Sequence, residues 1–171
     1  MNRKNEGAKG GFTLVELLVV VAIMGILMAA VVLAINPAAM MAKSRDATRL
    51  SDMVSVRQAI DFAVADGLVL TATATAGDSS TGTRVSTGSG WVNLDVSKYL
   101  STLPIDPRNG ATFTDAANNS VTGKYLYFSD GSAYELNCYL ESADNLSRYT
   151  GDGGDAAAMY EVGTDPGLDL M

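Results

Sequence analysis

The chain is 171 residues long, enough for one membrane-length helix and one domain of ordinary size, which argues against a two-domain enzyme. Its net charge of −7 argues against capture of nucleic acid by the surface as a whole, because phosphate binding requires clustered Lys and Arg side chains. The chain has no His, the commonest general base and transition-metal ligand, and its single cysteine, Cys138, excludes an intrachain disulfide.

A long apolar segment lies near the start of the chain. From Leu17 to Ile35 there is no charged or strongly polar residue, and this is about the length that crosses a hydrocarbon core of ~30 Å. Two ordinary interpretations are a single-pass anchor and a secretory signal peptide with small residues at Ala29, Ala30 and Ala34. Neither accounts for the residues before the segment: a basic stretch, two glycines and then the carboxylate of Glu16 at the membrane edge.

Residues 10–18, GGFTLVELL, follow that basic stretch. The string resembles the class III signal of type IV prepilins and type II secretion pseudopilins, in which a basic leader and a glycine precede Phe-Thr-Leu-x-Glu and an apolar helix. The resemblance implies that a prepilin peptidase, which is also an N-methyltransferase, cleaves between Gly11 and Phe12 and converts Phe12 to N-methylphenylalanine. Residues 1–11 would then be the leader peptide, and its loss would change the net charge from −7 to −9.

The chemistry of the junction agrees with that resemblance. Gly11 has no side chain to block a peptidase, and cleavage would leave the Phe12 amine as a cation at the positive end of a helix dipole. Glu16 lies one turn further on, and a carboxylate at membrane depth costs at least ~2.5–3.5 kcal/mol, so each charge requires a partner. The resemblance implies that Glu16 pairs with the amine of an adjacent subunit and sets its register. The alternative is that the Glu16 side chain merely extends to the lipid headgroups.

The resemblance also implies partners and a location. Subunits would polymerise with other pilin subunits through a transmembrane and filament-core helix at residues 12–36, served by an inner-membrane platform protein and an assembly ATPase. The precursor would lie in the cytoplasmic membrane with its N-terminus inside, before it joins a cell-surface pilus or a periplasmic filament. Basic residues are balanced across the apolar segment, so this topology follows from the resemblance more than from charge. No direct contact with nucleic acid is expected.

A kink or unwound stretch is expected between Gly25 and Pro37, because both residue types weaken a helix. After Pro37 the pattern becomes amphipathic, which predicts that residues 37–67 form the second half of the helix and that Gly67 ends it. The predicted apolar face consists of Met53, Val56, Ile60, Ala63 and Val64. The opposite face is expected to be solvated or to pair between subunits, and it carries Lys43, Arg45, Asp46, Arg49, Asp52, Arg57 and Asp61.

Residues 68–171 are predicted to form an extracytoplasmic head domain. Residues 68–90 are rich in Thr, Ser, Ala and Gly, which indicates a surface loop with at most one short strand. A short helix is predicted within residues 91–103. The LPIDP sequence at residues 103–107 resembles the Leu-Pro-x-Asp-Pro of many pilins and major pseudopilins.

A β-hairpin is the clearest strand signal in the head. Residues 125–128 and 133–140 flank the Asp130-Gly131 turn, and residues 159–162 are predicted to add a third antiparallel strand. The predicted fold class is therefore α+β and pilin-like, with a long N-terminal helix packed on a small antiparallel sheet.

Acidic residues and glycines gather near the C-terminus. Oxygen ligands on such a loop suit Ca²⁺, and the resemblance to major pseudopilins implies calcium in this region. No ligand motif aligns residue by residue, so Asp152 and Asp155 are named as the candidates and a turn-rich acidic surface is the default interpretation. No other cofactor is expected.

The leading hypothesis is a non-catalytic structural subunit, a prepilin of a type IV pilus or a similar filament. The alternatives within the family are a major pseudopilin of a type II secretion system, favoured by LPIDP and by the missing disulfide, and a minor or DNA-uptake pilin. A membrane-anchored enzyme is a rival from another class, but residues 68–171 offer no recognisable catalytic constellation. A membrane-anchored ligand-binding module is a third class, which would not polymerise when the peptidase is supplied.

Overall fold

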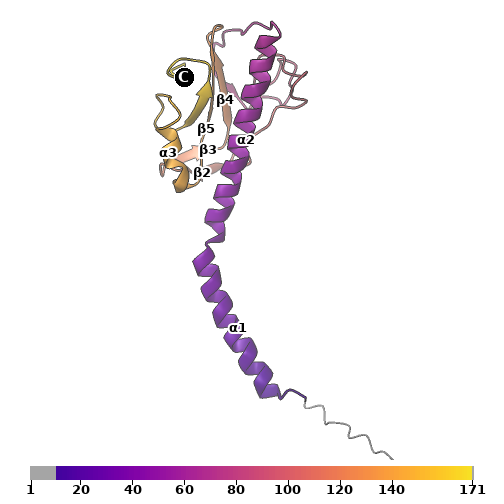
Figure 1. Ribbon diagram of the computed structural model, residues 1–171, viewed down its shortest axis with the longest axis vertical. Helices are drawn as coiled ribbons and strands as arrows, with labels where there is room; N and C mark the ends of the chain where they lie inside the picture. Colours follow the sequence, from indigo (N-terminus) through magenta and orange to yellow (C-terminus); the bar gives the residue numbers. More distant parts are fainter. Residues whose placement is uncertain (1–10, 171) are drawn as a thin grey trace, which may run out of the picture. The chain divides into compact units, whose positions relative to one another are not determined.

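The computed structural model describes residues 11–170, and the chain divides into two compact units between Met40 and Met41. The first unit holds helix α1 (Leu14–Ile35) and the start of helix α2 (Pro37–Ala65). The second unit, called the head here, holds the rest of α2 and all of the strands (Figure 1). A long apolar N-terminal helix with a small antiparallel sheet confirms the predicted α+β fold class.

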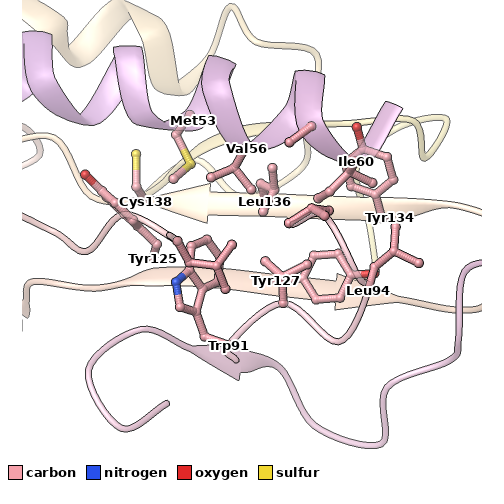
Figure 2. Close-up of a cluster of buried hydrophobic side chains, with 14 of the residues drawn as sticks. Met53, Val56, Ile60, Trp91, Leu94, Tyr125, Tyr127, Tyr134, Leu136 and Cys138 are labelled. Carbon is pink, nitrogen blue, oxygen red and sulfur yellow. The ribbon is translucent and has the colours of Figure 1, made fainter. Parts of the chain in front are cut away.

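Within the head, α2 packs an apolar face on the sheet. The prediction is confirmed at Met53, Val56, Ile60 and Ala63, which are all buried. Figure 2 shows Met53, Val56 and Ile60 directed from the helix toward the strands. The prediction is wrong for Val64, which is 39% exposed. Val64 is on the same side of the helix as Ile60, four residues earlier, but it is the second-last residue of α2, where the packed face ends.

The prediction of a solvated or intersubunit charged face is wrong at Asp46 and Arg49, which are fully buried in the head. Arg49 donates from Nε and Nη2 to the Asp106 carboxylate at 2.7 and 3.0 Å, and from Nη1 to Asp46 at 2.8 Å. Asp46 also accepts the backbone amides of Glu141 and Ser142. Asp46 and Arg49 can be buried because loops far along the chain supply their hydrogen-bond partners. The helical periodicity of the sequence does not indicate those loops.

Two further acids on this face bind sheet tyrosines rather than standing free in solvent. The hydroxyl of Tyr125 donates to Asp52 at 2.7 Å, and that of Tyr134 donates to Asp61 at 2.5 Å. Arg45 also has a partner within the head, because its guanidinium donates to the carboxylate of Glu141. The polar face of α2 is therefore largely an internal contact of the head.

The main sheet has the strand order β1-β4-β5-β6, and every neighbouring pair is antiparallel. The strands are β1 (Gly77–Asp78), β4 (Tyr125–Ser129), β5 (Tyr134–Cys138) and β6 (Tyr160–Gly163). The predicted hairpin and third strand are confirmed, with Leu136 of β5 opposite Tyr127 on one side and Val162 on the other. Asp130 fixes the turn, because its carboxylate accepts the amides of Ser132 and Ala133.

The segment between α2 and β4 is mostly irregular, with a small second sheet of β2 (Thr112–Thr114) and β3 (Ser120–Thr122). The short helix predicted within residues 91–103 is wrong, since no helix forms there. The backbone amides of Trp91 and Val96 donate to Thr83 and Ser86 in the preceding loop instead of to their own turn. This extended path buries Trp91, Val92, Leu94 and Val96 against the sheet, which one helical face could not do.

The end of α2 at Ala65 follows a C-capping pattern. Gly67 has φ +95°, its amide donates to the Val64 carbonyl, and the Leu68 amide donates to the Ala63 carbonyl. These two bonds form a Schellman motif, which needs a left-handed residue at the glycine position. The predicted role of Gly67 as the helix stop is confirmed. The short helices η1 (Ala143–Asn145) and α3 (Leu146–Tyr149) lie between β5 and β6 in the chain.

Candidate processing and assembly segment

The predicted cleavage junction lies ahead of α1, outside regular secondary structure. Gly11 and Phe12 are exposed, and the Phe12 side chain is 91% exposed. Among the residues that the structure describes, no heavy atom lies within 4 Å of the place that a side chain at Gly11 would occupy. An accessible, non-helical peptide bond is the form that proteases cleave. The rest of the predicted leader, residues 1–10, lies outside the described residues.

Thr13 and Glu16 form a capping box at the start of α1. Thr13 has an extended backbone, with φ −77° and ψ 152°, and its Oγ1 accepts the Glu16 amide at 3.2 Å. In return the Thr13 amide and the Thr13 hydroxyl each donate to Oε2 of Glu16 at 2.8 Å. The box satisfies backbone donors that the first turn of a helix leaves without partners. Glu16 therefore helps to cap the N-terminus of α1, in addition to being the carboxylate at the membrane edge that the sequence analysis identified.

Thr13 is the residue that the sequence argument missed. A Ser or Thr followed three residues later by Glu, just before an apolar run, is a sequence signature of a capping box. Residues 13–16, TLVE, have that spacing, so the signal was present in the sequence.

The surface of α1 is apolar on every side. Residues 14–32 form a helix long and apolar enough to cross a membrane, with a mean hydropathy of 2.8, and none of it is buried within the chain. The side chains of Leu14, Ile26 and Met28 are each more than 60% exposed. A soluble monomer would normally hide such a surface, so α1 needs lipid or other protein around it.

A break in the helix was predicted between Gly25 and Pro37, and the structure has it at the C-terminal end of that range. Gly25 lies inside continuous helix, so an unwound stretch that begins there is not what the structure shows. The interruption is at Asn36, a left-handed residue with φ 45° that ends α1. Its side-chain oxygen accepts the Ala39 amide at 3.3 Å, so Asn36 also caps α2, and Pro37 takes the first helical position, where its missing N–H is harmless. A single glycine weakens a helix by only about 1 kcal/mol, which is too little to break one as apolar as α1.

The two calcium candidates lie in the loop before β6. Both carboxylate oxygens of Asp152 accept backbone amides, from Gly154 at 3.1 Å and from Glu161 at 2.9 Å, and Asp155 is exposed. Within residues 11–170, no group of three or more acidic or cysteine side chains is arranged to hold a metal ion. We therefore identify no metal ligands in this loop, and calcium binding there stays a prediction.

Comparison with known proteins concerns the N-terminal segment. Residues 7–32 match the family described as a prokaryotic N-terminal methylation motif. The chain carries a class III prepilin signal. This prepilin signal is that of type IV pilins and pseudopilins, and it includes the capping box and most of α1. No curated protein and no solved structure matches the chain.

The prepilin signal relates the geometry of this segment to processing and assembly. It implies processing by a prepilin peptidase and assembly into pilus-like filaments. The apolar α1 that follows fits the membrane anchoring of such a precursor. An exposed junction, a capped carboxylate and an unburied apolar helix thus follow one another within the segment that carries the prepilin signal.

Proposed function

We propose that the protein is the precursor of a structural filament subunit, the prepilin of a type IV pilus or a closely related filament. It is cleaved between Gly11 and Phe12, methylated on the Phe12 amine and polymerised through α1. The observation that carries this proposal is the position of the prepilin signal, directly on a helix with apolar side chains exposed on every side. Removing such side chains from water contributes about 25 cal/mol per Å², so a bundle of identical helices is a favourable state for them.

Glu16 is proposed to bind the next subunit through one carboxylate oxygen. The hydrogen bonds described for this carboxylate all go to Oε2, from Thr13. Oε1 is then available to accept the Phe12 amine of an adjacent copy, while the capping box holds the carboxylate at a fixed orientation. Neutralising both charges in a low-dielectric filament core removes the cost that either would carry there alone.

The experiment is assembly in cells that contain a prepilin peptidase and a pilus assembly system, with Glu16→Ala and Glu16→Gln compared to wild type. We expect both variants to be cleaved normally, because the junction is intact, and to give at least about tenfold fewer filaments by electron microscopy, which corresponds to a loss of about 1.4 kcal/mol per subunit contact. Val19→Ala is the matched control in α1, since it changes no charge and is expected to assemble. Normal cleavage of Glu16→Ala with polymerisation at the wild-type rate would refute the role of Glu16.

The choice between a pilus and a type II secretion filament needs a separate observation. Leu103 and Asp106 of the LPIDP sequence are buried in the head, where Asp106 binds Arg49, so these two residues have a structural role. Filaments on the cell surface support the pilus. Filaments confined to the periplasm, with loss of protein secretion when the chain is absent, support the pseudopilin.

A further inference from the structure

Two asparagines of the chain begin an Asn-x-Ser sequence. They are Asn118, in residues 118–120 (NNS), and Asn145, in residues 145–147 (NLS). Asn-x-Ser, with any residue except Pro in the middle, is the sequence at which exported proteins accept an N-linked glycan. Short sequences of this kind also occur by chance. The structure therefore has to show whether either asparagine presents its side-chain amide to a transferase.

Asn118 lies in the turn that joins β2 to β3 (Figure 1). Its side chain is exposed, and so is that of Ser120, where β3 begins. Within the part of the chain that the structure describes, the side-chain hydrogen bonds of this turn join Asp115 to Asn119, and none involves the side chain of Asn118 or Ser120. Both groups of the Asn-x-Ser sequence are thus accessible from solvent.

The backbone of the turn places Asn118 at its tip. The Asp115 carboxylate accepts the Asn119 amide at 2.7 Å, and the Asp115 amide donates to the Asn119 carbonyl at 2.9 Å. Asn118 has φ +67°, in the left-handed region that Asn adopts more readily than most residues. This conformation accounts for an asparagine at position 118, but it does not require the hydroxyl of Ser120.

The hairpin of β2 and β3 is anchored to the head by residues other than Asn118. Phe113 of β2 is buried, and Cζ of Arg49 lies 4.7 Å from the centroid of its ring. The Ala116 amide donates to the Leu140 carbonyl at 2.7 Å. A glycan on the exposed amide of Asn118 would therefore extend into solvent without displacing a packed side chain.

The side chain of Asn145 is already occupied within the head. Its Nδ2 donates to Oδ2 of Asp46 at 2.7 Å, and its Oδ1 accepts Nε of Arg148 at 3.2 Å. Asp46 is fully buried. A glycan on Nδ2 of Asn145 would break the hydrogen bond to Asp46 and bring a sugar to a buried carboxylate. The two Asn-x-Ser sequences therefore differ, because one asparagine is an exposed acceptor and the other has a structural role.

We propose that Asn118 is an N-glycosylation site of the head. The donor is a lipid-linked pyrophosphate oligosaccharide, and the catalyst is a membrane oligosaccharyltransferase that reads the Ser120 hydroxyl as part of the acceptor. The Nδ2 of Asn118 attacks the anomeric carbon of the first sugar, and a C–N bond forms. The bond from that carbon to the phosphate oxygen breaks, lipid pyrophosphate leaves, and one amide proton passes to a base of the transferase. The proposal rests on the extracytoplasmic location of the head, which belongs to the proposed function.

The test is mass spectrometry of a tryptic digest of the full chain from its native cells. Trypsin cleaves after Lys and Arg, so Asn118 falls in the peptide of residues 109–124 and Asn145 in that of residues 125–148. We expect the first peptide to be heavier by one oligosaccharide, and a peptide N-glycosidase to remove the added mass and leave an aspartate at position 118. The peptide of residues 125–148 is the internal control and is expected to be unmodified.

Variants at Ser120 separate glycosylation from any other role of the turn. Ser120→Ala keeps Asn118 and its turn but removes the hydroxyl, so we expect the added mass on residues 109–124 to be lost. Ser120→Thr keeps the Asn-x-Ser/Thr pattern and is expected to retain the glycan. Unfolding followed by Trp91 fluorescence checks that both variants fold. A glycan that persists in Ser120→Ala, or one carried by residues 125–148 in its place, would overturn the proposal.

The same digest distinguishes this proposal from the proposed function. A processed chain gives an N-terminal peptide of residues 12–43 with one added methyl group, whereas an uncleaved chain gives residues 10–43. Unmodified residues 109–124 in the wild-type chain overturn glycosylation of Asn118, whichever N-terminal peptide accompanies them. The uncleaved peptide alone contradicts the prepilin function and leaves the result at Asn118 to be read separately.

Discussion

The N-terminal helix and the head differ in whether their apolar side chains are buried. In α1 the side chains of Val19 and Val20 are each 47% exposed, and others in the helix are exposed further. In the head, Ile60 and Leu136 are fully buried between α2 and the sheet. The head therefore has its own buried hydrophobic core, whereas α1 has an apolar surface that only lipid or other protein chains can cover. This contrast is the structural basis for a subunit that is folded before it is assembled.

The charged side chains of the two regions also differ in where their hydrogen-bond partners lie in the sequence. Glu16 lies on an exposed helix and its partner, Thr13, comes from its own first turn. Arg49 is buried and takes its partners from α2 and from the loop that carries Asp106. A local pair leaves the rest of the carboxylate available for a second molecule, while a buried network has no spare capacity. We therefore propose that the charge in α1 serves assembly, whereas the buried charge in the head serves stability.

The buried network gives the largest expected effect. Arg49→Ala would leave the Asp46 and Asp106 carboxylates buried without their cation, so we expect it to lower the free energy of unfolding of the head by about 3–5 kcal/mol. The control is Arg57→Ala, which breaks an exposed pair with Asp61 and is expected to change stability by less than about 1 kcal/mol. Denaturant unfolding of the full chain in detergent measures both, followed by the fluorescence of Trp91, the single tryptophan, which is 2% exposed. Equal effects of the two variants would contradict the contrast in charge.

Apolar truncation compares the two regions directly. Ile60→Ala leaves a cavity in the core and is expected to cost the head about 2–5 kcal/mol. Leu18→Ala in α1 removes a similar volume from a side chain that is 62% exposed, so we expect the unfolding transition reported by Trp91 to stay within about 0.5 kcal/mol of wild type. A loss of head stability in Leu18→Ala comparable to that in Ile60→Ala would show that α1 contributes to the core of the monomer.

The capping box gives the smallest expected effect. Thr13→Ala removes the cap and is expected to destabilise the first turn of α1 by about 0.5–2 kcal/mol, without changing the unfolding of the head. Thr13→Ser keeps the hydroxyl and serves as the control. Amide exchange of residues 14–17 in detergent measures the effect, and unchanged exchange in Thr13→Ala would mean that the box does not hold the helix start.

Local patterns in the sequence were sufficient to predict the N-terminal segment and the central hairpin of the sheet. The junction at Gly11, the carboxylate of Glu16 and the hairpin around Asp130 are encoded within a few residues. The hairpin was predicted from its own residues, and the junction from the family resemblance that residues 10–18 carry. The burial of Arg49 was not predicted, because its partner Asp106 lies in a distant loop and solvated charge is the usual outcome for such a residue. Glu135 and Glu161 are buried as well, and their burial was not predicted for the same reason, since only the pairing of β5 with β6 brings their surroundings together. Long-range partners decide which charges are buried, and one sequence does not display them.

The most direct test of the central claim is mass spectrometry of the N-terminus of the mature protein from cells that contain a prepilin peptidase. The prepilin account predicts a chain that begins at Phe12 and carries one methyl group on its amine. A mature chain that begins near Ala30 or Ala34, as after an ordinary signal peptide, would contradict it, and so would a chain that keeps residues 1–11.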